Sequence, residues 1–188
     1  MKIGVLALQG AVAEHLRCLG ECEVEPVAVK RVEQLRELSG LVIPGGESTT
    51  IGKLMEEYGF ISALRELGKR GFPIFGTCAG LILLAREIEG SSQPRLGLMD
   101  ILARRNAFGR QRESFEADLQ VQAVGSDPFR AVFIRAPYIE AAGKEVEVLA
   151  RFGEKIVMAR QGPFLASAFH PELTEDLRIH RYFLDMVK

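Results

Sequence analysis

Short apolar runs alternate with amphipathic segments through the first half of the chain. The runs typical of strands are almost uninterrupted aliphatic stretches, at residues 3–8, 24–29, 41–43 and 74–75. Segments with helical periodicity lie between them, at residues 11–19, 32–38, 51–58 and 60–69. Continuous aliphatic strands are typical of a sheet that helices cover on both faces, so this alternation predicts βαβ units around a parallel sheet.

The second half of the chain carries strand candidates that follow one another closely. They lie at residues 115–123, 131–136, 146–152 and 155–160. Turn signals at residues 125–128 and 152–154 separate them, which predicts an antiparallel addition to the parallel core. A further apolar strand begins at Phe164, residues 177–187 are predicted to form a closing helix, and residues 90–94 a flexible loop.

Length and charge narrow the class of protein. A chain of 188 residues has the length of one domain, and we expect a single domain over residues 1–188. Its 24 basic and 25 acidic residues nearly cancel, so no basic surface for nucleic acid is expected. No apolar run reaches the ~18 residues of a membrane span, and no export signal precedes the first strand. Cys18 and Cys22 are interpreted as packing residues, and free thiols fit a reducing cytoplasm.

A cysteine lies between two glycines where an apolar strand meets an apolar helix, in Gly76-Thr77-Cys78-Ala79-Gly80. This G-x-C-x-G pattern is the thiol version of the nucleophile elbow, in which small residues let strand and helix pack around a strained turn. Cys78 would project clear of the backbone, and the free amides of the helix N-terminus would favour its thiolate. The alternative is a buried structural cysteine between packing glycines.

His170 and Glu172 follow the last apolar strand candidate. In extended backbone, residues two apart point to the same side, and Pro171 disfavours helix at the residue before it. The Glu172 carboxylate is therefore expected to fix one imidazole nitrogen, which leaves the other as a base for Cys78. Taken alone, His170 also fits a capped or solvated histidine. For the other histidines, at positions 15 and 180, surface or packing roles are expected.

Gly45 and Gly46 follow a strand candidate directly, where their backbone amides are unobstructed. The amides of Gly46 and Ala79 are predicted to form an oxyanion hole. A phosphate-binding loop is the competing interpretation, but five residues instead of four separate Gly46 from Gly52, and no Ser or Thr follows Lys53. The first strand also lacks a G-x-G-x-x-G sequence after it. No nucleotide, other cofactor or metal is expected.

Together these motifs resemble the class I (triad) glutamine amidotransferases: G-T-C-A-G around Cys78, P-G-G-E-S around Gly45-Gly46, and H-P-E at residues 170–172. Longer strings resemble the glutaminase subunits of pyridoxal 5'-phosphate synthases, at residues 5–15, 105–119, 133–137 and 169–176. The resemblance covers essentially the whole chain. It implies a three-layer, flavodoxin-like α/β fold with a mostly parallel central sheet and an antiparallel addition in the second half.

The resemblance also implies hydrolysis of L-glutamine to glutamate and ammonia through a glutamyl thioester on Cys78, with His170 moving the proton and Glu172 orienting it. The residues that it assigns to the glutamine site are Gly46, Glu47, Ser48, Arg105, Ile134 and Arg135. An arginine suits the free α-carboxylate of an amino acid, although Arg105 by itself also fits ordinary surface charge.

The implied partner is the synthase subunit of pyridoxal 5'-phosphate synthase, which uses the ammonia with ribose 5-phosphate and glyceraldehyde 3-phosphate in a large assembly built on two six-membered rings. Gln9 and Gly10 follow the first strand, at the edge where an α/β sheet places its site, and are candidates for contact with the partner or the oxyanion loop. Three alternatives stay open: a glutaminase subunit for another synthase, a cysteine peptidase or stress-response hydrolase of similar fold, and a docking subunit without chemistry.

Overall fold

A mixed sheet of ten strands forms the centre of the fold, which the computed structural model describes for residues 1–106, 108–109 and 113–187. The strands of this sheet are β1 (Lys2–Leu6), β2 (Glu25–Val29), β3 (Gly40–Ile43), β4 (Ile74–Thr77), β5 (Ala85–Ile88), β6 (Met99–Arg104), β9 (Tyr138–Ala142), β10 (Glu147–Phe152), β11 (Lys155–Gln161) and β12 (Phe164–Ser167). Their order is β2-β1-β3-β4-β12-β11-β9-β6-β5, and β10 pairs with β11 outside this path. A separate antiparallel pair is formed by β7 (Ser114–Leu119) and β8 (Phe129–Ile134).

The sheet has a parallel part and an antiparallel part. Across the sheet, the pairings of β2 with β1, β1 with β3, β3 with β4 and β4 with β12 are parallel. In contrast, β11 runs antiparallel to β12, β9 and β10, and β6 runs antiparallel to β9. The predicted parallel core with an antiparallel addition in the second half is confirmed. Because β12 pairs with β4, a segment near the end of the chain lies beside the strand that precedes Cys78.

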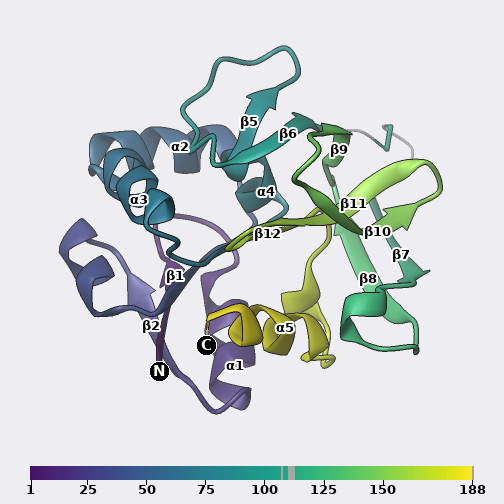
Figure 1. Cartoon of the computed structure of the whole chain (residues 1–188), viewed down its shortest axis with the longest axis horizontal. Helices are drawn as coiled ribbons and strands as arrows, with labels where there is room; N and C mark the ends of the chain where they lie inside the picture. The colour runs from purple at the N-terminus through teal and green to yellow at the C-terminus, as the bar shows by residue number, and fades with distance from the viewer. Residues whose placement is uncertain (107, 110–112, 188) are drawn as a thin grey trace.

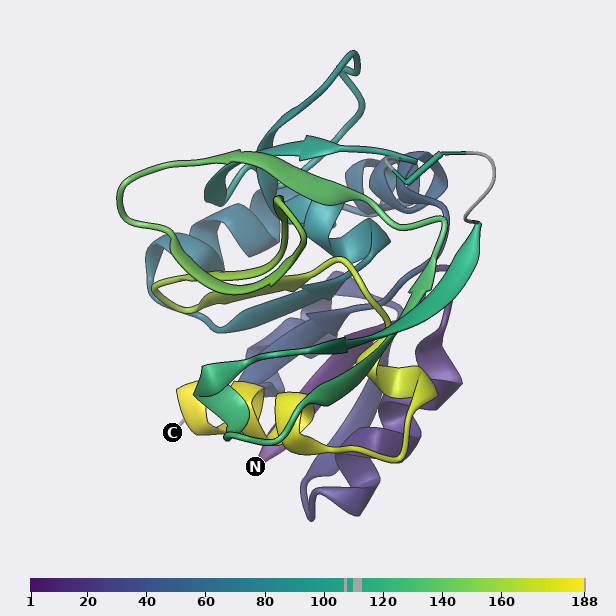
Figure 2. The same cartoon turned by 90° about the vertical axis from the view of Figure 1, so that its right-hand side faces the viewer.

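Helices cover both faces of the parallel part. They are α1 (Val12–Glu21), α2 (Ser48–Glu57), α3 (Phe60–Lys69), α4 (Ala79–Leu84) and α5 (Arg178–Val187). Figures 1 and 2 show α1 and α5 on one face of the sheet and α2, α3 and α4 on the other, which makes three layers. Every residue of β3, β4 and β12 is buried as a result, which explains why these three strands contain no charged residue.

Several segments differ from the sequence prediction. Strands β5, β6 and β9 were not predicted. Strand β5 is a short edge strand with two exposed charged residues, and β9 exposes three of its five residues. Residues predicted as a helix at 32–38 form the 3₁₀ helix η1 (Val32–Glu37), which buries only Leu35. The strand predicted at 115–123 ends at Leu119, and the 3₁₀ helix η2 (Gln122–Val124) follows.

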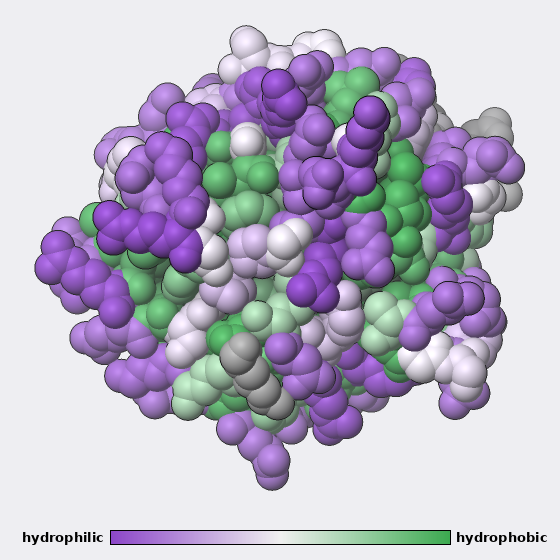
Figure 3. Space-filling model, viewed as in Figure 1, coloured by the Kyte–Doolittle hydropathy of each residue, from purple (hydrophilic) through white to green (hydrophobic). Residues whose placement is uncertain are grey.

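Aromatic side chains fill the two ends of the core. Near α5, the ring of Phe75 on β4 lies 5.6 Å from that of Phe183. Near the β7–β8 pair, Phe115 and Phe133 stack at 4.7 Å between ring centroids. Hydrophilic residues dominate the face shown in Figure 3, and hydrophobic ones are visible mainly in the recesses between them. No helix of the described residues is long and apolar enough to cross a membrane.

The core position of Phe75 gives a first prediction. Phe75 is fully buried, so Phe75→Ala removes its packing and is expected to lower the free energy of unfolding by about 3–5 kcal/mol. The exposed aromatic Tyr58 is the matched control, because Tyr58→Ala is expected to change stability by no more than about 0.5 kcal/mol. Urea denaturation followed by circular dichroism measures both, and equal losses in the two variants would contradict the packing described here.

Candidate active site

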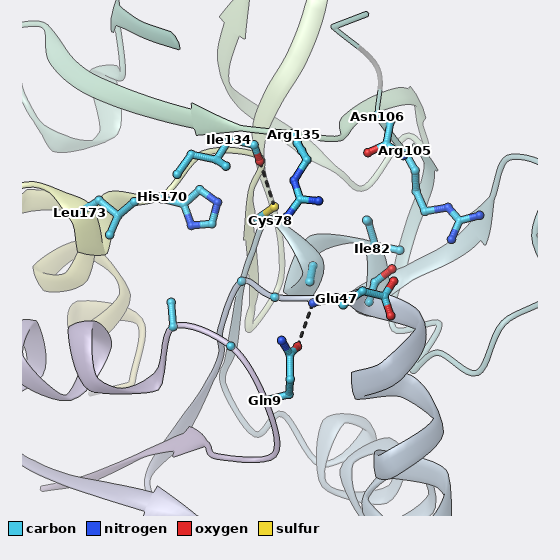
Figure 4. Close-up of a pocket in the computed structure, with 16 residues that line it drawn as sticks. Gln9, Glu47, Cys78, Ile82, Arg105, Asn106, Ile134, Arg135, His170 and Leu173 are labelled. Atoms are coloured by element: carbon cyan, nitrogen blue, oxygen red, sulfur yellow. Dashed lines mark hydrogen bonds between the residues drawn. The ribbon is translucent and has the colours of Figure 1, made fainter. Parts of the chain in front are cut away.

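Four neighbouring parallel strands end at one edge of the sheet, and each is followed by predicted site residues. Gln9 and Gly10 follow β1, Gly45 and Gly46 follow β3, Cys78 follows β4, and His170 follows β12. This edge is where open α/β sheets place their ligands. A cavity of about 440 Å³ lies there (Figure 4). It is lined by Gln9, Gly10, Ala11, Gly45, Gly46, Glu47, Ser48, Cys78, Ala79, Ile82, Arg105, Asn106, Ile134, Arg135, His170 and Leu173.

The cavity thus collects every predicted site residue except Glu172, which lies buried behind His170. It brings Arg105 from the end of β6 and Ile134 and Arg135 from the end of β8 to the residues that follow the parallel strands. The string at residues 105–119 lies only partly within the structure, because residues 107 and 110–112 are outside the described ones.

The turn between β4 and α4 holds Cys78 in a strained conformation, with φ 50° and ψ −100°. A side chain at Gly76 would collide with the backbone of Gly80, and one at Gly80 would collide with the carbonyl of Ile43. The two glycines therefore permit the close approach of β3, β4 and α4 that keeps this turn tight, as in a nucleophile elbow. The Cys78 amide donates to the Ser167 carbonyl at 2.8 Å, which ties the turn to β12.

His170 lies between Cys78 and Glu172. Its Nδ1 is 2.7 Å from Oε1 of Glu172, and its backbone amide donates to the Val132 carbonyl at 2.8 Å. The predicted contact between the two side chains is present, but the predicted extended backbone is wrong. β12 ends at Ser167, and Glu172 lies in the 3₁₀ helix η3 (Pro171–Leu173), because proline is well accommodated in the first turn of a helix.

Charges on both sides of the imidazole set its protonation. Burial lowers the pKa of His170, but Cys78 and Glu172 outweigh it and raise this pKa to about 10. Burial raises the pKa of Glu172, but the hydrogen bond and the positive charge of His170 hold this pKa below its usual range. A carboxylate and a protonated imidazole thus lie next to each other, with the imidazole beside Cys78.

The loop after β3 is held by the turn after β1. The Gly45 carbonyl accepts from the Ala11 amide at 2.9 Å, and the Glu47 amide donates to Oε1 of Gln9 at 2.8 Å (Figure 4). A side chain at Gly10, whose φ is +103°, would collide with the Gly45 carbonyl. Gln9 and Gly10 therefore contact the predicted oxyanion loop, and their contact with a partner stays a prediction.

The two backbone amides predicted to bind the oxyanion belong to residues that line the cavity. Among the described residues, neither the Gly46 amide nor the Ala79 amide donates a hydrogen bond to another protein group. Both residues line the cavity beside Cys78. Two unpaired donors next to a nucleophile are what stabilisation of a tetrahedral oxyanion requires.

Glu47 caps α2 with its side chain. Its Oε1 accepts from the Thr49 amide at 3.3 Å, and its Oε2 accepts from the Thr50 amide and hydroxyl, both at 2.7 Å. The Thr50 hydroxyl is the main cause that lowers the pKa of Glu47. The predicted binding residue is thus a carboxylate fixed at a helix N-terminus on the cavity wall.

Arg105 and Arg104 point to different environments although they are neighbours. The Arg105 Nη1 donates to Oε1 of Gln93 at 2.9 Å, and it lies across the cavity from His170 (Figure 4). Arg104 instead pairs with Glu89 at 2.7 Å. Gln93 is largely buried, so the segment predicted as a flexible loop supplies a fixed partner for the predicted binding arginine.

The sequence prediction did not include Ala11, Ile82, Asn106 and Leu173, which also line the cavity. Asn106 has a positive φ of 48°, and Arg135 one of 41°. Asparagine tolerates this left-handed region better than most residues, so the Asn after Arg105 was the available signal for a turn at the site. Nothing local to Ile82 or Leu173 distinguishes them from packing residues.

The fold is shared with solved structures, one of which is described as a glutamine amidotransferase. PurLQS from Thermotoga maritima shares it at a TM-score of 0.73, over 100% of this chain and 98% of that one, with only 16% identity. A solved structure described as a glutamine amidotransferase superposes at a TM-score of 0.95 with 53% identity, covering 98% of each chain.

At the level of sequence, residues 5–188 match the model of the SNO glutamine amidotransferase family, and the chain belongs to that family. A relative from Pelotomaculum thermopropionicum, named pyridoxal 5'-phosphate synthase subunit PdxT, is 70% identical over 98% of this chain and 94% of its own length. The resemblance to this family that the motifs carry is thereby confirmed over nearly the full chain.

The raised pKa of His170 predicts how stability depends on pH. A group whose pKa rises on folding stabilises the protein fully below its unfolded pKa of about 6.5, and this contribution is lost as the pH rises to the folded value. The pKa of His170 in the folded protein is about 10. The loss of unfolding free energy in His170→Gln is therefore expected to be larger at about pH 6 than at about pH 10. Urea denaturation of both proteins across this range measures it, and a difference that grows with pH would contradict the assignment.

Proposed function

We propose that this chain is the glutaminase subunit of a pyridoxal 5'-phosphate synthase. It hydrolyses L-glutamine to glutamate and ammonia and delivers the ammonia to a synthase subunit, which makes pyridoxal 5'-phosphate from ribose 5-phosphate and glyceraldehyde 3-phosphate. The observation that carries the chemistry is the 2.7 Å contact between His170 and Glu172 beside the strained cysteine turn. The family and the name of the relative at 70% identity support the choice of glutamine and of the partner.

In the proposed reaction, the Cys78 thiolate attacks the side-chain amide carbon of glutamine. The carbonyl oxygen takes the negative charge and is held by the Gly46 and Ala79 amides. His170 gives its proton to the amide nitrogen and the carbon–nitrogen bond breaks. Ammonia departs, and the glutamyl group remains on Cys78 as a thioester. A water molecule then attacks the thioester as His170 takes its proton, the carbon–sulfur bond breaks, and glutamate leaves with the thiolate and imidazolium restored.

The side of the cavity opposite His170 is proposed to recognise the α-amino and α-carboxylate groups of glutamine. Arg105 would bind the α-carboxylate through its planar guanidinium, which Gln93 holds in place. Glu47 and Ser48 at the start of α2, with Ile134 and Arg135 at the end of β8, would form the walls of this glutamine site. Because glutamine is an extended molecule, a carboxylate site across the cavity from His170 suits an amide placed at Cys78.

The proposal includes a partner, because ammonia is useful to a synthase only while it is unprotonated and shielded from water. Gln9 and Gly10 are proposed contacts with the synthase subunit, since they lie at the cavity and hold the loop of Gly45 and Gly46. The assembly on two six-membered rings, the single domain over residues 1–188 and a location in the cytoplasm belong to the same proposal. A reducing compartment would keep the Cys78 thiol, which is unpaired in the structure, reactive.

Replacement of the nucleophile tests the reaction. Cys78→Ala is expected to lower glutamine hydrolysis, measured with the synthase subunit present, at least about a thousandfold, because no thioester can form. Cys22 follows the C-terminal end of α1, whereas the cavity lies at its N-terminal end, so Cys22 is the matched control and Cys22→Ala is expected to retain near wild-type activity. Glutamate formation and pyridoxal 5'-phosphate formation are followed in parallel.

The outcomes of this experiment separate the open alternatives. Glutamine hydrolysis that only a different synthase stimulates indicates a subunit of another pathway. Cleavage of peptides without hydrolysis of free glutamine indicates a cysteine hydrolase of similar fold. Unchanged activity of the complex with Cys78→Ala indicates a docking subunit without chemistry. Each of these results would contradict the proposed function.

The neighbouring residues Arg104, the last of β6, and Arg105, which follows it, allow a test of substrate recognition. Arg105→Gln removes the proposed charge-assisted contact with the α-carboxylate, worth about 1.5–3 kcal/mol, so KM for glutamine is expected to rise roughly ten- to a hundredfold. Arg104→Gln is the control, because Arg104 pairs with Glu89 and Glu140 outside the cavity and should leave KM unchanged. Steady-state kinetics on both variants measure the effect, and equal KM values would remove Arg105 from the glutamine site.

A further inference from the structure

A chain of buried polar side chains continues behind Glu172, away from the cavity. Nε2 of His15 lies 3.1 Å from the Thr77 hydroxyl and 3.5 Å from Oε2 of Glu172. Its Nδ1 lies 3.0 Å from Nε2 of His180. The two imidazoles, predicted to have surface or packing roles, are in fact fully buried, so the surface role is wrong. Burying two polar rings costs free energy unless their nitrogens are used.

The second oxygen of Glu172 needs a hydrogen-bond donor. Oε1 is engaged by His170, whereas Oε2 is buried and lacks a hydrogen bond of good geometry within the described residues. A buried carboxylate oxygen without a donor is costly. Nε2 of His15, at 3.5 Å, is the nitrogen placed to supply one.

The neighbouring groups decide which nitrogen of His15 carries the proton. With the proton on Nε2, His15 presents an N–H to Thr77 and Glu172, and its Nδ1 accepts from Nε2 of His180. With the proton on Nδ1, a lone pair would face the carboxylate, and His180 would carry its proton on Nδ1. That atom of His180 is buried without a partner among the described residues, so this tautomer would leave an unpaired N–H. The first tautomer is favoured on both counts.

The two histidines act as neutral donors. Burial lowers the pKa of His15 despite the opposing charge of Glu172, and burial together with His15 lowers the pKa of His180 to about 3. A neutral imidazole N–H can donate a hydrogen bond to the Glu172 carboxylate without forming a second ion pair with it. The ion pair between Glu172 and His170 is thereby left intact.

Helix α1, which carries His15, also contacts the backbone of Glu172. Nη2 of Arg17 donates to the Glu172 carbonyl at 3.3 Å, and Sγ of Cys18 lies 3.9 Å from the same oxygen. With His15 at the carboxylate, three residues of α1 contact Glu172. The rotation of its side chain is the remaining freedom, and the contact of His15 with Oε2 limits it.

We propose that His15 is a positioning residue for the triad, whose Nε2–H holds Oε2 of Glu172 so that Oε1 stays aligned on His170. His180 fixes the tautomer of His15. The contact of His15 with Thr77, the residue before Cys78, connects this arrangement to the nucleophile turn. The inference rests on the proposed glutaminase function. It assigns no contact with substrate to His15.

Kinetics of three variants in complex with the synthase subunit test the inference. His15→Leu keeps a buried side chain without a donor and is expected to lower kcat about ten- to a hundredfold, the usual effect of losing a partner that orients a functional group, while KM for glutamine stays unchanged. His15→Gln places an amide N–H near the position of Nε2 and should recover most of kcat. Leu19→Ala, at another fully buried position of α1, should lose stability without this loss of kcat.

Equal losses of kcat in His15→Leu and His15→Gln, a parallel rise of KM, or full activity of His15→Leu would overturn the inference. Should His15→Leu fail to fold, the tautomer in the wild type decides the matter. The chain contains only three histidines, so their ¹⁵N chemical shifts can be assigned, and a proton on Nδ1 of His15 would overturn the inference. A wild type that hydrolyses no glutamine contradicts the proposed function instead, because the tautomer is measured without turnover.

Discussion

The tight turn at Cys78 is the constraint on which the rest of the site depends. It exists because β3, β4 and α4 approach one another more closely than any side chain larger than hydrogen allows at Gly76 and Gly80. The turn holds a non-glycine residue at φ 50°, a strained conformation that surrounding packing must enforce. The strain is supported by buried strands on both sides and by the hydrogen bond from the Cys78 amide to β12. The position of the sulfur is therefore a property of the core, not of a surface loop.

A second constraint follows from the charged Glu172 carboxylate, which is buried next to this core. Glu172 is buried, and a buried carboxylate is tolerated only with hydrogen-bonded or charged partners. His170 satisfies one of its oxygens and is itself held protonated by its neighbours. The chemistry proposed for Cys78 and the pairing of the buried Glu172 carboxylate thus use the same contact between His170 and Glu172.

Helix α1 connects the two halves of the site. At its N-terminal end, Ala11 and the preceding Gln9 hold the loop that carries Gly46, the proposed oxyanion donor. One to two turns further along, His15, Arg17 and Cys18 contact Glu172. The amide donors for the oxyanion and the carboxylate behind the base therefore share one rigid support, although they lie far apart in the sequence.

The sequence by itself determined the order of strands and helices in the parallel half, the elbow cysteine, and the family, because glycine spacing and aliphatic runs report local backbone requirements directly. It did not reveal β5, β6 and β9, whose burial depends on neighbours far along the chain. It placed Glu172 beside His170 for the wrong backbone reason, since η3 and not an extended strand carries it. Only the tertiary structure decided that His15 and His180 are buried behind Glu172 and that Gln93 holds Arg105. These contacts join α1, α5, η3 and the segment before β6, and side-chain contacts between distant elements follow from packing, which no local pattern encodes.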